Sequence, residues 1–136
     1  MKFTADFHIH SKYSRATSRD GVPEVLDFWA GRKGLQLIGT GDFTHPAWRE
    51  ELREKLKPGL YALKDEYRLK GSTGNDGTRF VLSAEISSIY KKKDKVRKVH
   101  NVILLPDLES ADKLSYRLEQ IGNLHSDGRP ILGLDS

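Results

Sequence analysis

Two histidines separated by one residue, His8 and His10, have the types and spacing that most directly suggest chemistry in this sequence. They lie in residues 3–10, which read as a β-strand, and side chains alternate between the two faces of a strand. Both imidazoles are therefore expected to point the same way. Such a pair can hold one divalent metal, because neutral histidine is the commonest nitrogen ligand in proteins.

Asp42 and His45 lie just beyond a second strand-like run, residues 35–40. The glycines in this stretch allow a tight turn and the close approach of a ligand. An ordinary turn that caps a helix starting at Pro46 would explain the same residues. Both interpretations stay open from this stretch alone.

Glu85 is a more informative carboxylate, because it lies inside the apolar run of residues 80–86. Carboxylates are rarely fully buried unless they are paired or bound to a metal, although a position facing water at a sheet edge would also explain Glu85. His100 lies in a similar run, residues 99–105, where a histidine bonded to the backbone is the ordinary alternative.

Metal-binding residue types thus follow successive predicted strands, and this order favours a single site. In α/β barrels and open parallel sheets, active sites form at the carboxyl ends of successive strands. Mixed imidazole and carboxylate ligands suit Zn²⁺, Mn²⁺ or Fe²⁺ better than Mg²⁺ or Ca²⁺, which prefer oxygen ligands. The candidate ligands are His8, His10, Asp42, His45, Glu85 and His100.

The elements that must position these residues read as an α/β fold. A helix is predicted from Pro23 to about Gly34, between the first two strands, which gives a parallel strand–helix–strand unit. Trp29 of this helix is expected in the core. A second helix is predicted to begin at Pro46, and a short one within residues 60–69. Further predictions are a loop over residues 71–77, a helix over 110–121 and a strand over 131–134.

A β-hairpin with a lysine-rich tip is predicted between these helices. Folding it about Lys92 and Lys93 places Glu85 opposite His100, although the turn type is not specified and the register could differ by one or two residues. The hairpin strands are predicted over residues 79–90 and 96–105.

Composition excludes several classes of protein. The 136 residues contain no Cys, which excludes disulfides and thiolate metal sites, and no apolar run approaches the ~20 residues needed to span a bilayer. We find no signal-peptide pattern and expect a cytoplasmic protein that does not contact a membrane. The net charge of +4 permits a phosphate or nucleic-acid partner without requiring one.

Four short motifs together resemble the first three metal motifs of the PHP (polymerase and histidinol phosphatase) superfamily. Two longer stretches, residues 10–17 and 39–46, most resemble the PHP domain of the endonuclease Q family, whose members nick DNA beside deaminated bases. The resemblance covers essentially the whole chain. The four motifs are residues 6–11, 41–45, 83–85 and 99–101.

This resemblance implies a distorted (β/α)7 barrel that holds two or three divalent metals and hydrolyses phosphoesters. By the same resemblance, His8 and His10 would bind one metal, and Glu85 would bridge to a second metal bound by His100. A third metal would be bound by His45, with Asp42 as ligand or orienting group. Glu85 and Asp42 are then the candidate catalytic residues.

The chain departs from the family pattern in three places. Phe43 and Thr44 separate the aspartate and histidine that are usually adjacent, and Arg15 and Ala16 stand where many relatives have an acidic residue or histidine. The later metal motifs of the family have no match after His100. We therefore expect residues 1–136 to be the N-terminal portion of a PHP-type domain, with an exposed sheet edge that favours self-association.

Cationic residues near these motifs are candidates for substrate binding. Lys12 and Arg15 follow the first strand and could hold a phosphate, although an ordinary solvated loop explains them at least as well. The hairpin tip could follow a nucleic-acid backbone, and Tyr13 and Trp48 lie near the presumed site. The candidate nucleic-acid-binding residues of the tip are Lys91, Lys92, Lys93 and Lys95, within a segment that also contains Arg97 and Lys98.

Three functions are compatible with the sequence. The favoured one is metal-dependent phosphoester hydrolysis as part of an endonuclease acting on deaminated DNA, with DNA as the partner of the full-length protein. The alternatives are a small-molecule phosphatase of the histidinol-phosphatase kind, and a truncated fragment that catalyses nothing by itself. Whether this chain alone is an enzyme stays open at this point.

Overall fold

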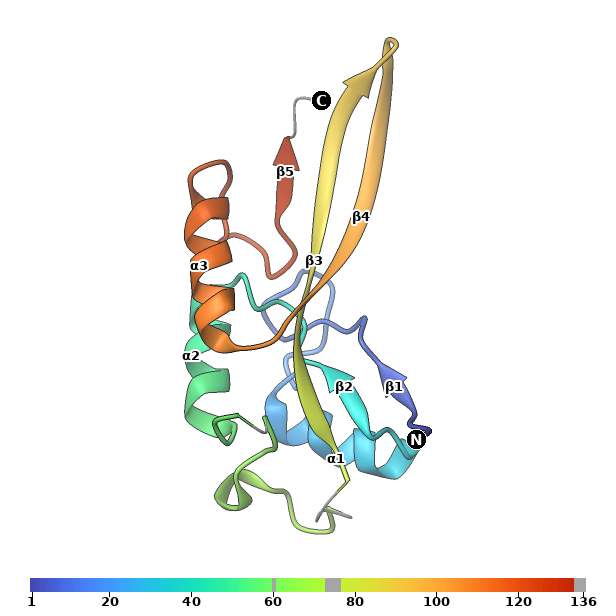
Figure 1. Ribbon diagram of the computed structural model, residues 1–136, viewed down its shortest axis with the longest axis vertical. Helices are drawn as coiled ribbons and strands as arrows, with labels where there is room; N and C mark the ends of the chain where they lie inside the picture. Colours follow the sequence, from blue (N-terminus) through green and yellow to red (C-terminus); the bar gives the residue numbers. More distant parts are fainter. Residues whose placement is uncertain (60, 73–76, 134–136) are drawn as a thin grey trace.

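The computed structural model describes residues 1–59, 61–72 and 77–133. It is an α/β structure in which a sheet carries helices α2 and α3 on one side, and a long hairpin extends from one end (Figure 1). This confirms the predicted fold class, while the barrel and its extent stay predictions. In the described ranges, no helix has the length and apolar character required to cross a membrane.

Within the described residues the sheet has five strands, ordered β1-β2-β3-β4, with β5 paired to β3. Neighbours are parallel except for β3 and β4, which form the antiparallel hairpin. The parallel pairing of β1 with β2 around α1 confirms the predicted strand–helix–strand unit. The strands are β1 (Ala5–Asp6), β2 (Leu37–Gly39), β3 (Arg79–Lys92), β4 (Lys95–Leu105) and β5 (Ile131–Gly133).

The first strand is much shorter than the predicted range of residues 3–10. Its partner β2 pairs through only two residues, Leu37 and Ile38, and the following turn then comes very close to the first segment. A Cβ at Gly39 would lie 2.6 Å from the Phe7 carbonyl oxygen, and one at Gly41 would lie 2.5 Å from that of Ile9. The histidines therefore lie on an irregular segment packed against glycines.

The helices begin and end largely at the positions predicted from the proline and glycine residues. Helix α1 (Pro23–Lys33) is followed by Gly34 with a left-handed φ of 72°, and α2 is Pro46–Lys55. Helix α3 (Leu108–Glu119) begins earlier than predicted, because the Asp107 carboxylate accepts a hydrogen bond from the Ser110 backbone N–H at 2.7 Å.

The predictions for the short helix and for Trp29 need correction, and some predicted positions lie outside the described residues. Of the helix predicted within residues 60–69, the described part contains only a short 3-10 helix, Asp65–Tyr67. Trp29 is 53% exposed rather than in the core, because α1 buries the face of Pro23, Asp27 and Ala30, and Trp29 lies about 200° around the helix from Asp27. Position 60 of the predicted helix, positions 73–76 of the predicted loop and position 134 of the last predicted strand lie outside the described residues.

The hairpin register differs from the predicted one by two residues. The turn is formed by Lys93 and Asp94, both at positive φ, as in the type I′ turns that suit the twist of hairpins. Glu85 consequently pairs with Val102, and His100 pairs with Ser87. A shift of two residues preserves the face on which a side chain lies, so His100 remains on the face of Glu85.

Helices α2 and α3 and the sheet enclose the core, which is centred on Trp48, Phe43 and Leu82. The Trp48 ring is fully buried, and its indole N–H points at the carbonyl oxygens of Thr40 (3.2 Å) and Gly41 (2.8 Å). Strand β4, by contrast, is largely exposed and pairs only with β3 in the described sheet. Self-association through this edge stays a prediction.

Candidate metal centre

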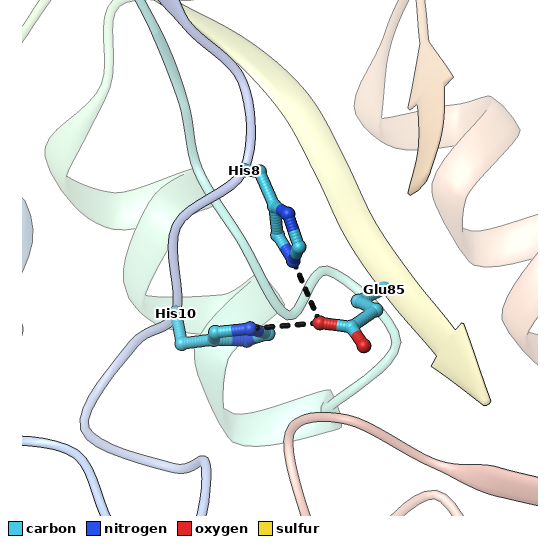
Figure 2. A group of neighbouring side chains, drawn as sticks. All are labelled: His8, His10 and Glu85. Carbon is cyan, nitrogen blue, oxygen red and sulfur yellow. Dashed lines mark hydrogen bonds and ion pairs between the residues drawn. The ribbon is translucent and has the colours of Figure 1, made fainter. Parts of the chain in front are cut away.

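Three side chains converge, two from the irregular segment that follows β1 and one from strand β3. The Oε2 atom of Glu85 lies 2.7 Å from His8 Nε2 and 2.9 Å from His10 Nε2 (Figure 2). One potential ligand atom from each residue lies within 4.8 Å of the other two. The two imidazoles thus face the same point, as the spacing predicted, although their segment is not a strand.

His100 approaches the other oxygen of the same carboxylate, because its Nδ1 is hydrogen-bonded to Glu85 Oε1. The Glu85 side chain is only 2% exposed, whereas those of His8 and His100 are about half exposed. The Glu85 carboxylate therefore lies on the buried side of the group, and the imidazoles of His8 and His100 lie on the side that solvent can reach.

Histidine contacts keep Glu85 ionised. Burial alone would raise its pKa, but hydrogen bonds from His8 and His100, together with the positive charge of Arg129, lower the pKa of Glu85 to about 2. The group therefore presents an anionic oxygen and imidazole nitrogens at neutral pH, which is the donor set expected for Zn²⁺, Mn²⁺ or Fe²⁺.

Asp42 lies directly behind His10 and is completely buried. Its Oδ2 accepts hydrogen bonds from the Ser11 N–H and hydroxyl, both at 2.6 Å, and from the Ser14 hydroxyl at 3.0 Å. Its Oδ1 lies 3.1 Å from His10 Nδ1. Because both oxygens of Asp42 already have hydrogen-bonding partners, Asp42 suits the orienting role. It accepts a hydrogen bond from His10 Nδ1 and so leaves His10 Nε2 facing Glu85.

Asp42→Asn should test this arrangement through the His10 ring. The hydrogen bond that His10 donates to Asp42 raises the pKa of His10 despite the opposing effect of burial, so the amide should lower that pKa in the metal-free protein. Metal affinity should fall by about 10- to 100-fold, as when other partners behind a ligand are lost. NMR titration of the His10 ring measures the first effect and calorimetry the second; an unchanged His10 titration would contradict the assignment.

His45 does not join the three-residue group. Its ring stacks on Tyr13 with 4.2 Å between centroids, and its Nδ1 is buried without a hydrogen-bond partner among the described residues. Burial lowers the pKa of His45. The third metal stays a prediction, and the buried Trp48 ring is not available for base stacking.

The predicted cationic residues differ in their exposure and in their ion-pair partners. Lys12 Nζ pairs with Glu51 at 2.7 Å, whereas the Arg15 side chain is 78% exposed, with its Nε 3.6 Å from Asp127 Oδ2. The lysines at positions 91–95 are exposed at the far end of the hairpin. Their role in nucleic-acid binding stays a prediction.

Arg129 is a cation beside the centre that the motifs did not indicate. Its Nη1 lies 3.9 Å from Glu85 Oε2. Neither a periodic pattern nor a metal-type residue marks it, and its position depends on the pairing of β5 with β3. The nearest sequence signal is a charged residue between Gly128 and Pro130, directly before a strand.

The α/β fold and the buried glutamate in contact with three histidines place this chain among candidate metal-binding proteins. Among such proteins, this chain resembles endonuclease Q. The crystal structure of PfuEndoQ, a lesion-specific endonuclease from Pyrococcus furiosus, superimposes with a TM-score of 0.76 at 29% identity, over 97% of this chain and 29% of that one. An endonuclease Q complex with a 27-mer duplex bearing an abasic lesion at the active site gives the same TM-score and identity, over 30% of its chain.

A curated sequence is also similar to this chain. The chain is 33% identical over 135 residues to a protein of Methanocaldococcus jannaschii named "Uncharacterized protein MJ0043". No protein-family model matches the chain. It spans only 14% of the curated relative and less than a third of the two endonuclease Q chains. The two structural similarities confirm the endonuclease Q resemblance that the motifs predicted.

Proposed function

We propose that this chain forms the metal-binding portion of a DNA-repair endonuclease that hydrolyses a phosphodiester bond beside a deaminated or otherwise damaged base. The observation that carries the proposal is the convergence of His8, His10 and His100 on the buried carboxylate of Glu85. The similarity to a lesion-specific endonuclease over almost the whole chain supports the choice of substrate.

The residues present fit divalent transition metals. His8 Nε2, His10 Nε2 and Glu85 Oε2 would hold one ion, and Glu85 Oε1 with His100 Nδ1 offers donors for a second. Such ions lower the pKa of a bound water and neutralise charge on phosphoryl oxygens. The protein's part is positional: Asp42 orients the His10 ring, and burial holds the Glu85 carboxylate in place.

DNA would be held by the exposed hairpin. Its tip concentrates positive charge at Lys91, Lys92, Lys93 and Lys95, and contacts between such side chains and phosphates release counterions and make affinity fall with salt. The endonuclease Q complex with duplex DNA supports this partner. The proposal therefore separates a catalytic end of the hairpin from a DNA-holding end.

Metal content and strand nicking test the proposal together. After incubation with Zn²⁺ or Mn²⁺ and removal of free ion, we expect one or more metals per chain by elemental analysis, lost in His10→Ala. His125→Ala is the matched control, because this exposed histidine lies outside the group. Metal-loaded protein should then nick duplexes containing uracil, hypoxanthine or an abasic site.

Absence of metal in the unmodified chain would contradict the proposed centre. A metal content that His10→Ala and His125→Ala reduce equally would show that the ion binds elsewhere. A loaded chain that hydrolyses small phosphomonoesters but leaves damaged duplexes intact would contradict the proposed substrate.

A further inference from the structure

Arg129 lies beside the candidate metal ligands, but an arginine is not itself a metal ligand, so its place there needs another explanation. Its guanidinium Nη1 lies 3.9 Å from Glu85 Oε2, the same oxygen that faces His8 and His10. That distance is beyond a hydrogen bond, and within the described ranges its guanidinium forms no hydrogen bond. The side chain is 38% exposed, so its donors border both the ligand group and solvent.

The backbone that carries Arg129 is fixed on both sides. The Gly128 N–H donates to the Tyr13 carbonyl oxygen at 3.0 Å, and the Pro130 carbonyl oxygen accepts from the Ser87 N–H at 3.0 Å. A Cβ at Gly128 would lie 2.6 Å from Asp42 Oδ2, so only glycine allows this approach. The backbone at Gly128 is therefore packed closely against the Asp42 carboxylate, which orients His10.

A second arginine is linked to the same segment. The Asp127 Oδ1 atom accepts hydrogen bonds from the backbone N–H groups of Arg15 (3.2 Å) and Arg129 (3.1 Å). Asp127 Oδ2 lies 3.6 Å from Arg15 Nε. One aspartate thus connects the backbone segments of two arginines, one beside Glu85 and one further out in solvent.

We propose that Arg129 binds a non-bridging oxygen of the substrate phosphate, beside the metals, and that Arg15 is the outer cation of the same phosphate-binding site. This inference rests on the proposed function. Guanidinium groups suit this task because their planar donors match phosphate oxygens in pairs. The fixed backbone allows Arg129 to meet the phosphate without ordering a mobile loop first.

Inorganic phosphate is the probe, and Arg129→Gln is the principal variant, because glutamine removes the charge and keeps a polar side chain at this partly exposed position. Metal content by elemental analysis should be unchanged, since Arg129 is not a ligand. Phosphate affinity of the metal-loaded chain, by calorimetry, should fall by about tenfold or more, the scale of a charge-assisted hydrogen bond. Arg129→Lys should retain part of the affinity, and Arg117→Ala, at an exposed helix position, should retain all of it.

The outcomes separate this inference from the function beneath it. A fully loaded Arg129→Gln protein with unchanged phosphate affinity would overturn the assignment of Arg129 and leave the metal centre standing, as would a loaded unmodified chain that binds no phosphate. Metal loss in Arg129→Gln would show that Arg129 supports the ligands instead. An unmodified chain that takes up no metal would overturn the proposed function, and the inference with it.

Discussion

Glu85→Gln is expected to abolish metal binding while leaving the fold in place. Glutamine has nearly the same shape, but its neutral amide cannot supply the anionic oxygen that His8 and His10 surround at 2.7 and 2.9 Å. The loss should exceed the roughly 10- to 100-fold cost of removing a partner behind a ligand. Elemental analysis and calorimetry with Zn²⁺ or Mn²⁺ measure it, and nicking should be lost in parallel.

Acid stability gives the same variant a second readout in the metal-free protein. Because the folded state lowers the pKa of Glu85 from 4.5 to about 2, the ionised carboxylate stabilises the fold above pH 4.5. That contribution is lost as the pH falls towards 2. Glu85→Gln should lack this part of the acid dependence, which urea unfolding at several pH values would show.

A matched control is available on the exposed face of α3. Glu109 pairs with Lys113 in solvent, with its side chain 77% exposed, so Glu109→Gln should change neither metal content nor acid stability. Retention of a full complement of metal by Glu85→Gln would refute the proposed role of this carboxylate as a metal ligand.

Trp48→Ala is expected to lower the free energy of unfolding by about 3–5 kcal/mol, the range for removing a buried tryptophan or phenylalanine ring. The ring is fully buried, and its N–H binds the carbonyls of Thr40 and Gly41, immediately before Asp42. Such a loss is a large part of the 5–15 kcal/mol typical of a folded domain. Urea unfolding followed by circular dichroism measures it.

The other tryptophan provides the comparison. Trp29 is 53% exposed on α1, so Trp29→Ala should cost well under the loss at Trp48, within about 1 kcal/mol. Trp48→Phe should fall between the two alanine variants, because it keeps much of the ring and loses the hydrogen bonds. Equal destabilisation by Trp29→Ala and Trp48→Ala would contradict the described core.

Local sequence signals predicted the elements that they directly control. Proline at positions 23 and 46 and glycine at 34 mark helix ends because each restricts or permits particular backbone angles. The extent of β1 and the hairpin register followed from tertiary pairing instead. Alternation along residues 3–10 does not reveal that β2 pairs through two residues, and no glycine marks the left-handed turn at Lys93 and Asp94.

The candidate site likewise has a part that local sequence signals predicted and a part that depends on tertiary contacts. His8, His10, Glu85 and His100 were found from residue type and strand position, and their face was right even where the register was not. Choosing the orienting role for Asp42 required the positions of Ser11 and Ser14 around it. Arg129 reaches Glu85 only because β5 pairs with the middle of β3, a long-range contact without a local pattern.

The uninterrupted strand β3 sets a length scale for any duplex that lies along it. Lys93, at the turn, follows Glu85 by eight residues, which at about 3.3 Å per residue separates the two by about 26 Å. DNA rises about 3.4 Å per base pair, so this interval corresponds to about eight base pairs. If the lysines bind phosphates of a duplex, the hairpin would place those phosphates about three quarters of a helical turn from the candidate metal centre.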